Sequence, residues 1–500
     1  MTPEVPQGTA TAHDARLRLA IAAIILAGLA LRLAAAAMPV SAHPDEVFQY
    51  LEQAHRLAFG YGTVPWEYRY GIRSWLLPLA ISPAMRLGAW LDPSGGLYLF
   101  LPKAIAAALS LLIPWSAFRL GQRRSLVHGL VALIVTALWY QFIFFGAHVL
   151  TDSLAVSLLM PAAMILTGPA PKRTPLSLAG LLLGVATMLR FQYAPSLAIL
   201  VIFTCRTDLR RWGWVIGGGI AGLAVSGIVD LAMGQLPFAW IVANVHQNIL
   251  LGRATRYGVE GPFEYLLMYL EEWGPALIPI LFWAARVAKR YQPLVWMGLA
   301  NLLVHSFIAH KEFRFVLPTT VVLVILAAIG SVDWVQSVSS RWTARRARLA
   351  VIGLCAFWTA ASAALAMNPL MYRRWWAFSS VYESVQVARA QPGLCGLAFV
   401  RMPFWQGGGY TYLHRPVPMY TLDPPVPQTT TAAYNVIIAP RDVPVPAGYR
   451  PLSCITGKDG LRPEHGEYPR IVCTYIRAGG CTPAAAAPFE VQTMLNRTDQ

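Results

Sequence analysis

Charged residues are scarce in this sequence: they make up 13% of its 500 positions, whereas hydrophobic residues make up 56%. A soluble globular protein carries about twice that share of charge, so the bulk of this chain is predicted to be a polytopic membrane protein. The formal net charge of +16 could indicate a nucleic-acid partner. We expect none, because the basic residues fall mainly in short clusters between apolar runs, as the positive-inside rule describes.

Motifs for nucleotide and zinc binding are also missing. No P-loop, GxGxxG, HExxH or GxSxG sequence occurs in a fitting context, so nucleotide use on the cytoplasmic side has no basis in the sequence. No CxxC pair occurs, so zinc is not expected. Cys205 and Cys355 lie in or beside apolar runs and are expected to be inert, whereas Cys395, Cys454, Cys473 and Cys481 lie in the C-terminal tail. An extracytoplasmic tail would form one or two disulfides, with three connectivities open for two bridges.

Eleven apolar runs are predicted to be transmembrane helices. They lie at residues 19–38, 97–118, 126–147, 152–168, 175–190, 193–205, 213–232, 274–288, 293–309, 314–332 and 349–367. The first is about 20 residues long, which suits a membrane span better than the shorter core of a signal peptide. A cleaved signal peptide is the alternative, because Val40-Ser41-Ala42 resembles a signal-peptidase site. Residues 1–15 are polar and are expected to be disordered.

Basic clusters occupy every second gap between these runs and predict which gaps face the cytoplasm. They are Arg119/Arg123/Arg124, Lys172/Arg173, Arg206/Arg210/Arg211, Arg286/Lys289/Arg290 and Arg341/Arg345/Arg346/Arg348. The outer gaps are then 39–96, 146–152, around 190–193, 233–273, 310–314 and the tail from 368. The chain is therefore expected to divide into a cytoplasmic N-terminus (1–15), a transmembrane domain (16–367) and an extracytoplasmic C-terminal domain (368–500).

The first outer gap is predicted to hold two helices at the membrane surface. Val47, Leu51, Ala54 and Ala58 fall on one helical face, while Gln49, Glu52, Gln53 and Arg56 face away from it. This pattern is typical of an amphipathic interfacial helix, with an ordinary solvated helix as the alternative. Gly60 and Gly62 would end it, and a second interfacial helix is expected at about 79–91.

The C-terminal domain is rich in Pro and Gly and contains strand-like runs at 394–400, 434–440 and 470–477. These runs predict a small mixed α/β or β-rich unit. The end of the chain, from Ala484, is expected to be loose. No residue in this domain stands out as a candidate for chemistry.

The first candidate site follows the first apolar run, where residues 43–49 read HPDEVFQ. His43, Asp45 and Glu46 stand side by side just outside the membrane. Neighbouring residues on an extended segment point in opposite directions, so one carboxylate can act as a base while the other binds or caps. Helix capping by Asp45 is the structural alternative, because this residue follows Pro44 and precedes a helical pattern.

The second and third candidate sites lie on the same predicted side. Trp66, Glu67, Tyr68 and Arg73 come from the first outer gap, Arg190 and Gln192 from a short hairpin, and His310, Lys311 and Arg314 from the segment HKEFRF. Aromatic side chains suit sugar rings or the membrane interface. Lys311 and Arg314 could bind a phosphate anchored to a lipid, although snorkelling to lipid head groups is the alternative. His148 and Asp152 share this face.

These segments, in this order, resemble glycosyltransferase family 22, which contains mannosyltransferases of glycolipid-anchor and lipid-linked oligosaccharide assembly. The matching segments are HPDEVFQY at 43–50, GYGTVPWEYRYGIRSW at 60–75, TMLRFQYAP at 187–195 and HKEFRF at 310–315. The resemblance covers about residues 39–330. Where family members commonly have Thr, this chain has Pro65, which bears on the acceptor more than on the chemistry.

The resemblance implies an all-α membrane GT-C fold, a polyprenyl- or dolichyl-phosphate sugar donor and inversion at the anomeric carbon. It implies that Asp45 is the catalytic base, with Glu46 as the second catalytic residue, and that the acceptor is a lipid-linked or envelope glycan. No DxD-type motif occurs in the outer gaps, so neither a metal nor another cofactor is expected. The composition, rich in Ala and Arg and poor in Lys, is typical of a high-GC bacterium, which would place the protein in the inner membrane. A GT-C transferase of another group, such as arabinose or phosphoethanolamine, and a lipid transporter or flippase are the alternatives.

Overall fold

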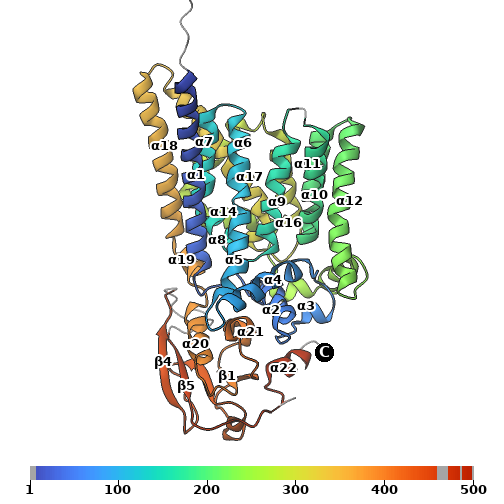
Figure 1. Ribbon diagram of the computed structural model, residues 1–500, viewed down its shortest axis with the longest axis vertical. Helices are drawn as coiled ribbons and strands as arrows, with labels where there is room; N and C mark the ends of the chain where they lie inside the picture. Colours follow the sequence, from blue (N-terminus) through green and yellow to red (C-terminus); the bar gives the residue numbers. More distant parts are fainter. Residues whose placement is uncertain (1–6, 170, 459–470, 485–486, 498–500) are drawn as a thin grey trace, which may run out of the picture.

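A bundle of long helices carries a smaller unit with a β-sheet at one end (Figure 1). The computed structural model describes residues 7–169, 171–458, 471–484 and 487–497. All eleven apolar runs are helical, as predicted. The helices are α1 (Gln7–Ala36), α5 (Leu97–Ser110) with α6 (Leu112–Gln122), α7 (Leu126–Leu138) with α8 (Tyr140–Gly146), α9 (Thr151–Leu166), α10 (Arg173–Leu189), α11 (Ala194–Cys205), α12 (Leu209–Ala232), α15 (Leu277–Val287), α16 (Gln292–Ser306), α17 (Leu317–Val338) and α18 (Ala344–Ala366). The disorder predicted for 1–15 is wrong from Gln7 onward, where α1 begins, and residues 1–6 lie outside the described residues.

The helices of the bundle differ in length. Five segments are long and apolar enough to cross a membrane, and the pair α7 and α8, bent by 56°, passes the same test together. The five segments are Asp14–Ala36, Leu97–Gln122, Leu209–Ala232, Phe313–Val338 and Ala344–Ala366. Helices α9, α10 and α11 are shorter. Helix α17 contacts α7, α15, α16 and α18 and is the most enclosed of the five, with 94% of its most apolar stretch buried.

Helices α10 and α12 lie side by side and approach each other through glycines (Figure 1). A Cβ atom on Gly180 would lie 2.0 Å from the Val215 carbonyl oxygen, and one on Gly218 would lie 2.0 Å from that of Ser177. Close backbone approach through small residues is the packing mode that membrane helices favour. These glycines therefore fix the spacing between α12 and α10, the helix that ends directly before Arg190.

The predicted cytoplasmic gaps come together at the end of the bundle away from the sheet. Arg123 donates a hydrogen bond to the Thr167 hydroxyl at 2.9 Å, and Arg211 donates one to the Leu166 carbonyl at 2.8 Å. Arg290 donates one to the Arg123 carbonyl at 3.4 Å. Three basic clusters thus share one end, as the alternation of gaps predicts.

The first outer gap contains the two predicted helices, but its packing differs from the prediction. It holds η1 (Glu46–Leu51), α2 (Glu52–Phe59), α3 (Trp66–Arg69) and α4 (Leu76–Leu91). The face predicted to be solvated is buried: the exposed fraction is 2% for Gln49 and 0% for Glu52 and Gln53. The prediction of an exposed polar face is therefore wrong. The C-terminal domain covers Glu52, whereas Gln49 and Gln53 hydrogen-bond to the segment 63–67.

Glu52 makes the contact that explains this burial. Its carboxylate accepts hydrogen bonds from the backbone N–H groups of Thr63 (2.7 Å), Tyr410 (3.1 Å) and Thr411 (2.8 Å), and from the Thr411 hydroxyl (2.6 Å). Gly409 has a φ of +61°, and a Cβ there would lie 2.9 Å from a Glu52 oxygen. The polar face of α2 is thus an interdomain attachment.

The C-terminal domain is built on a five-stranded mixed sheet in the order β2-β1-β3-β5-β4. Its strands are β1 (Leu397–Val400), β2 (Met419–Leu422), β3 (Val436–Pro440), β4 (Arg450–Thr456) and β5 (Ile471–Ile476). Strands β1, β3 and β5 match the three predicted runs, whereas β2 and β4 were not predicted. Helix α20 (Ser379–Arg389) contacts β3, β4 and β5, which confirms the mixed α/β class.

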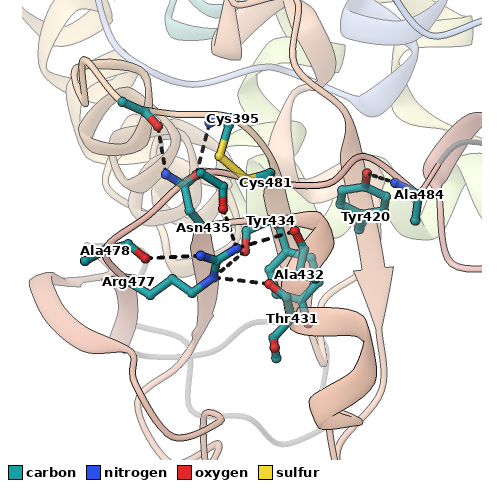
Figure 2. The surroundings of a disulfide bond; sticks show 12 residues. Cys395, Tyr420, Thr431, Ala432, Tyr434, Asn435, Arg477, Ala478, Cys481 and Ala484 are labelled. Carbon is teal, nitrogen blue, oxygen red and sulfur yellow. Dashed lines mark hydrogen bonds between the residues drawn. A yellow bond between two sulfur atoms is a disulfide. The ribbon is translucent and has the colours of Figure 1, made fainter.

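All four tail cysteines are disulfide-bonded, which selects one of the three connectivities. Cys395 pairs with Cys481, and Cys454 in β4 pairs with Cys473 in β5. Beside the first bridge, the Arg477 guanidinium donates hydrogen bonds to backbone carbonyls of residues 431–434 (Figure 2). Cys205 and Cys355 are free, as expected.

The end of the chain is docked rather than loose. Helix α22 (Val491–Arg497) lies against the loop before α3. The Gln492 side chain accepts a hydrogen bond from the Val64 N–H at 2.8 Å and donates one to the Val64 carbonyl at 3.2 Å. Arg69 donates one to the Asn496 side chain at 3.0 Å. The expectation of a loose end is therefore wrong for residues 487–497, while 485–486 and 498–500 lie outside the described residues.

Replacing Glu52 by Gln should loosen the C-terminal domain. The Gln amide has one acceptor oxygen instead of two, and its NH₂ group would lie against the N–H and O–H donors that now bind the carboxylate. We therefore expect the free energy of unfolding to fall by about 2–3 kcal/mol. Limited proteolysis in detergent should then cut the C-terminal domain faster. The control is Glu383→Gln, whose partner Lys458 lies 3.8 Å away with a side chain 54% exposed. Equal proteolysis of the two variants would contradict the attachment.

Candidate active site

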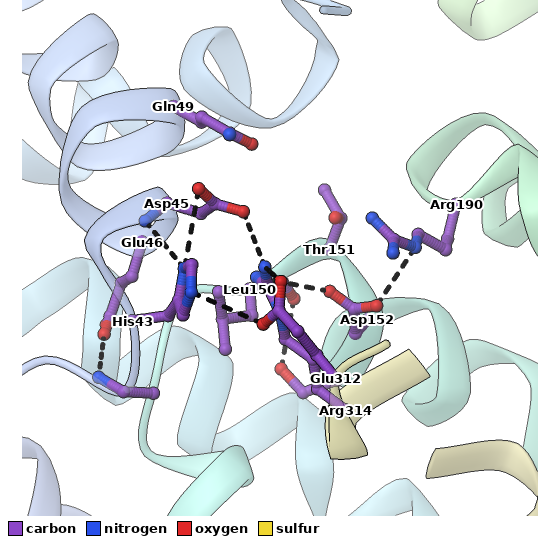
Figure 3. Close-up of polar contacts among 12 residues, drawn as sticks. His43, Asp45, Glu46, Gln49, Leu150, Thr151, Asp152, Arg190, Glu312 and Arg314 are labelled. Atoms are coloured by element: carbon purple, nitrogen blue, oxygen red, sulfur yellow. Dashed lines mark hydrogen bonds and ion pairs between the residues drawn. The ribbon is translucent and has the colours of Figure 1, made fainter. Parts of the chain in front are cut away.

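Arg314 is the hub of a charged cluster at the sheet end of the bundle. It lies in η6 (Phe313–Val316), directly before α17, and its side chain is 4% exposed. Its Nη2 donates a hydrogen bond to Asp45 Oδ2 at 2.6 Å and its Nε donates one to Glu312 Oε2 at 2.7 Å. Its Nη1 lies 3.8 Å from Asp152 Oδ2 (Figure 3). One guanidinium thus joins carboxylates from three separate segments.

Histidines complete this cluster. The Asp45 N–H donates to His43 Nδ1 at 3.2 Å, so His43 Nε2, 3.4 Å from a Glu312 oxygen, carries the proton. His310 Nε2 lies 3.1 Å from the other Glu312 oxygen. His43, Asp45 and Glu312 offer ligand atoms within 4.8 Å of one another, a spacing that a metal ion could use. The Arg314 guanidinium already bridges the two carboxylates, so this group has its cation.

Asp45 remains accessible and ionised. Its side chain is 23% exposed, and it makes no helix-capping hydrogen bond, so the structural alternative for Asp45 finds no support among the described residues. Burial raises the pKa of Asp45, but the Arg314 guanidinium, His43 and Arg73 outweigh that effect and lower the pKa well below its ordinary value. A carboxylate at this position can therefore accept a hydrogen bond from a hydroxyl group.

Glu46 points away from Asp45 into a separate buried network (Figure 3). It accepts hydrogen bonds from the N–H groups of Ala42 and Val149, and it lies 2.8 Å from His148 Nδ1. Burial raises its pKa, but His148, Lys103 and the Val149 N–H together lower it to about 2. The expectation that one of the two carboxylates binds rather than reacts thus fits Glu46, which ties η1 to the loop before α9.

Arg190 and Asp152 extend the cluster toward the α10 hairpin. Arg190 Nε lies 3.0 Å from Asp152 Oδ1, and the Arg190 guanidinium lies over the Phe315 ring at 4.4 Å. The Tyr193 hydroxyl donates hydrogen bonds to Asp152 at 3.5 Å and to the Arg314 carbonyl at 3.2 Å. Asp152 and Glu312 were not among the predicted site residues. The signal for Asp152 was a carboxylate in an otherwise apolar stretch, and the signal for Glu312 was a carboxylate between the basic residues of HKEFRF.

The PWEY segment lies next to this cluster. Gln49 donates a hydrogen bond to Glu67 at 2.9 Å, and the Tyr68 hydroxyl donates one to the Gln49 carbonyl at 2.8 Å. Trp66 is directed to the 233–273 gap, where its Nε1 donates to the Tyr257 hydroxyl at 3.0 Å. Glu67 and Tyr68 therefore brace η1, whereas Trp66 faces outward.

Three of the predicted substrate-binding residues line a common pocket, whereas Lys311, predicted to bind the donor phosphate, binds backbone carbonyls. Arg73, Arg190 and Gln192 line one pocket together with Tyr50 and Thr151. Lys311 does not face Arg314: its ammonium group donates hydrogen bonds to the carbonyls of Glu260 (3.2 Å) and Ile308 (2.5 Å), and the residue is 3% exposed.

The chain matches the model of the Alg9-like mannosyltransferase family over residues 23–393. It belongs to this family. Its relatives include GPI mannosyltransferase 3 of Yarrowia lipolytica, which is 25% identical over 394 residues that cover 77% of this chain and 73% of the relative. GPI mannosyltransferase 3 of Drosophila melanogaster is 29% identical over 329 residues, covering 59% and 54%. Human GPI alpha-1,2-mannosyltransferase 3 is 26% identical over 296 residues, covering 55% and 51%.

Solved structures support the fold of this family member. ArnT from Cupriavidus metallidurans, bound to undecaprenyl phosphate, superimposes with a TM-score of 0.61 and 13% identity, over 93% of this chain and 99% of ArnT. The apo structure of ArnT gives 0.56. The protein is thus a multi-pass membrane glycosyltransferase with the GT-C fold, as predicted. The transporter alternative has no support from these relatives.

The buried pair of Glu46 and His148 should make the free energy of unfolding depend on pH in the acidic range. Because the folded pKa of about 2 lies below the ordinary value of 4.5, the pair stabilises the fold above about pH 4.5 and loses this contribution as the pH falls toward 2. The loss amounts to about 3 kcal/mol in total, of which about 2 kcal/mol is gone at pH 3. Thermal unfolding in detergent between pH 6 and pH 3 measures it. Glu46→Gln should be less stable at pH 6 and less sensitive to acid; an unchanged acid dependence would count against the pair.

Proposed function

We propose that this family member is an inverting mannosyltransferase that works on the extracytoplasmic side of a bacterial inner membrane. Its donor would be a polyprenyl-phosphate mannose and its acceptor a lipid-linked or envelope glycan. The observation that carries the proposal is the accessible Asp45 carboxylate, held by Arg314 at the bundle end opposite the basic clusters. By the positive-inside rule that end faces away from the cytoplasm.

The proposed step is a single displacement. The acceptor hydroxyl oxygen attacks the anomeric carbon while Asp45 takes the hydroxyl proton. The bond between that carbon and the phosphate oxygen breaks, and its electron pair leaves with the lipid phosphate. Asp45 has a lowered pKa, so its carboxylate is unprotonated at neutral pH when the acceptor binds. The hydrogen bond from Arg314 fixes the orientation of this carboxylate.

Two comparisons support the lipid donor. The relatives are named as GPI mannosyltransferases, and the structural neighbour ArnT was solved with undecaprenyl phosphate. Such a donor would present the anomeric carbon of its sugar to the acceptor hydroxyl beside Asp45, and the lipid phosphate would leave from the opposite face of the sugar. His43, next to Asp45, is a substrate-binding candidate, and the outward-facing Trp66 could offer its aromatic face to an acceptor sugar. Glu67 and Tyr68 would act indirectly, through the η1 segment that they brace.

Asp45→Asn should remove transfer while leaving the protein folded. The amide cannot accept the proton, so we expect the transfer rate to fall by about 10²–10⁴-fold. The assay is mannose transfer from synthetic polyprenyl-phosphate mannose by purified protein, with thermal unfolding measured on the same samples. Asp442→Asn is the matched control, because this exposed carboxylate pairs only with Arg401 among the described residues. Near-normal turnover by Asp45→Asn would remove Asp45 from the mechanism.

Chelating divalent ions should leave the transfer rate unchanged. The Arg314 guanidinium hydrogen-bonds to both Asp45 and Glu312 and so occupies the position between the two carboxylates that a metal ion would take. The measurement compares transfer before and after dialysis against EDTA. A loss that Mn²⁺ or Mg²⁺ restores would contradict this and would assign a metal to His43, Asp45 and Glu312.

A further inference from the structure

The pocket beside the charged cluster is lined by both polar and apolar side chains. The polar lining residues are Tyr50, Arg73, Ser74, Thr151, Arg190 and Gln192. The apolar lining residues are Leu76, Leu77, Met188, Leu189, Phe191 and Trp240. Two guanidinium groups in a pocket that also has aliphatic and aromatic lining suit a ligand with an anionic head and an apolar chain.

Arg73 is the unusual member of this pocket. Among the described residues its side chain has no hydrogen-bond or ion-pair partner, and its Nε is buried without one. Burial lowers its pKa, but the Tyr50 hydroxyl and the carboxylates of Asp45 and Glu67 raise it above the ordinary value, so Arg73 is a cation. The Arg73 side chain is partly exposed, while its buried Nε has no hydrogen-bond partner, so the guanidinium is accessible to an anion that would complete the site.

Arg190 supplies the second cation. Only its Nε is paired, with Asp152 at 3.0 Å, so its two terminal nitrogens have no partner among the described residues. Figure 3 shows its side chain extending toward Thr151, whose hydroxyl shares a 2.8 Å hydrogen bond with Tyr50. Asp152 thus fixes the Arg190 side chain and leaves its outer edge available.

The two cations predicted from the HKEFRF segment are occupied instead. Arg314 hydrogen-bonds to Asp45 and Glu312, and Lys311 hydrogen-bonds to two backbone carbonyls. A phosphate at Arg314 would have to compete with these carboxylates for the same N–H groups. Arg73 and the terminal nitrogens of Arg190 could bind a phosphate without displacing a carboxylate.

We propose that Arg73 and Arg190 form the subsite for the phosphate of the lipid donor, with the first part of the lipid chain against the apolar wall. This inference rests on the proposed function and moves the phosphate site away from Lys311 and Arg314. When the bond from the anomeric carbon to the phosphate oxygen breaks, the electron pair stays on that oxygen, and the phosphate charge changes from −1 to −2. Two guanidinium groups bind the more highly charged leaving group more strongly, so they accelerate bond breaking as well as donor binding.

The test is direct binding of undecaprenyl phosphate and of inorganic phosphate to purified full-length protein, followed by donor kinetics. Arg73→Gln should weaken undecaprenyl phosphate binding by about 10- to 100-fold and lower kcat as well as raise the donor KM. Arg73→Lys should recover part of the binding. Arg86→Gln is the matched control, because this exposed arginine of α4 donates only to the carbonyls of Leu57 and Ala58. Since Arg73 has no protein partner, its replacement should leave the thermal unfolding temperature unchanged.

The outcomes separate this subsite from the proposed reaction. Weaker lipid-phosphate binding by Arg73→Gln and Arg190→Gln supports the subsite even if mannose is not the transferred sugar. Competition by inorganic phosphate in the wild type, lost in Arg73→Gln, shows that the phosphate and not the lipid chain is recognised. Unchanged binding by Arg73→Gln, together with weaker binding by Lys311→Gln, would overturn the inference and return the phosphate to the HKEFRF segment.

Discussion

The ion pair between Arg314 and Asp45 is the constraint on which the site depends. It joins residues 269 positions apart and brings η1 to η6, while the same guanidinium approaches Asp152 at the start of α9. Asp152 is fully buried, and without a cationic partner its carboxylate would carry a large desolvation penalty. These ion pairs require η1, η6 and the start of α9 to lie together at one end of the bundle. The packing of the membrane helices and the assembly of the site therefore depend on each other.

The co-location of the site was predictable from the sequence, but the division of roles was not. Gap alternation and the order of motifs placed Asp45, Arg190 and Arg314 on one side, and all three belong to one charged cluster. Which carboxylate of the adjacent pair stays accessible depends on His148 and the loop before α9, about a hundred residues away. Periodicity describes which face of a helix a residue occupies and carries no information on such distant partners.

The same limit explains the misassigned surface of α2. Its alternation of apolar and polar residues indicates a helix with one solvated side, and no local signal shows that Thr411, 359 positions away, supplies donors to Glu52. The tail gave a similar result. Three strands were predicted from short apolar, strand-like runs, whereas β4, with a largely exposed burial pattern, and the docked helix α22 were not predicted. Hydropathy patterns therefore do not predict hydrogen bonds between polar residues of two domains.

The attachment at Glu52 also has a mechanical meaning. Asp45 and Glu52 lie on one continuous helical segment, seven residues and roughly 10 Å apart. Tilting that segment by about 5° around Glu52 would swing the Asp45 carboxylate by roughly 1 Å, a misalignment that can cost a reaction about a hundredfold in rate. The C-terminal domain, which contributes no reacting atom, thus holds the helical segment in the orientation that aligns Asp45 with the acceptor hydroxyl.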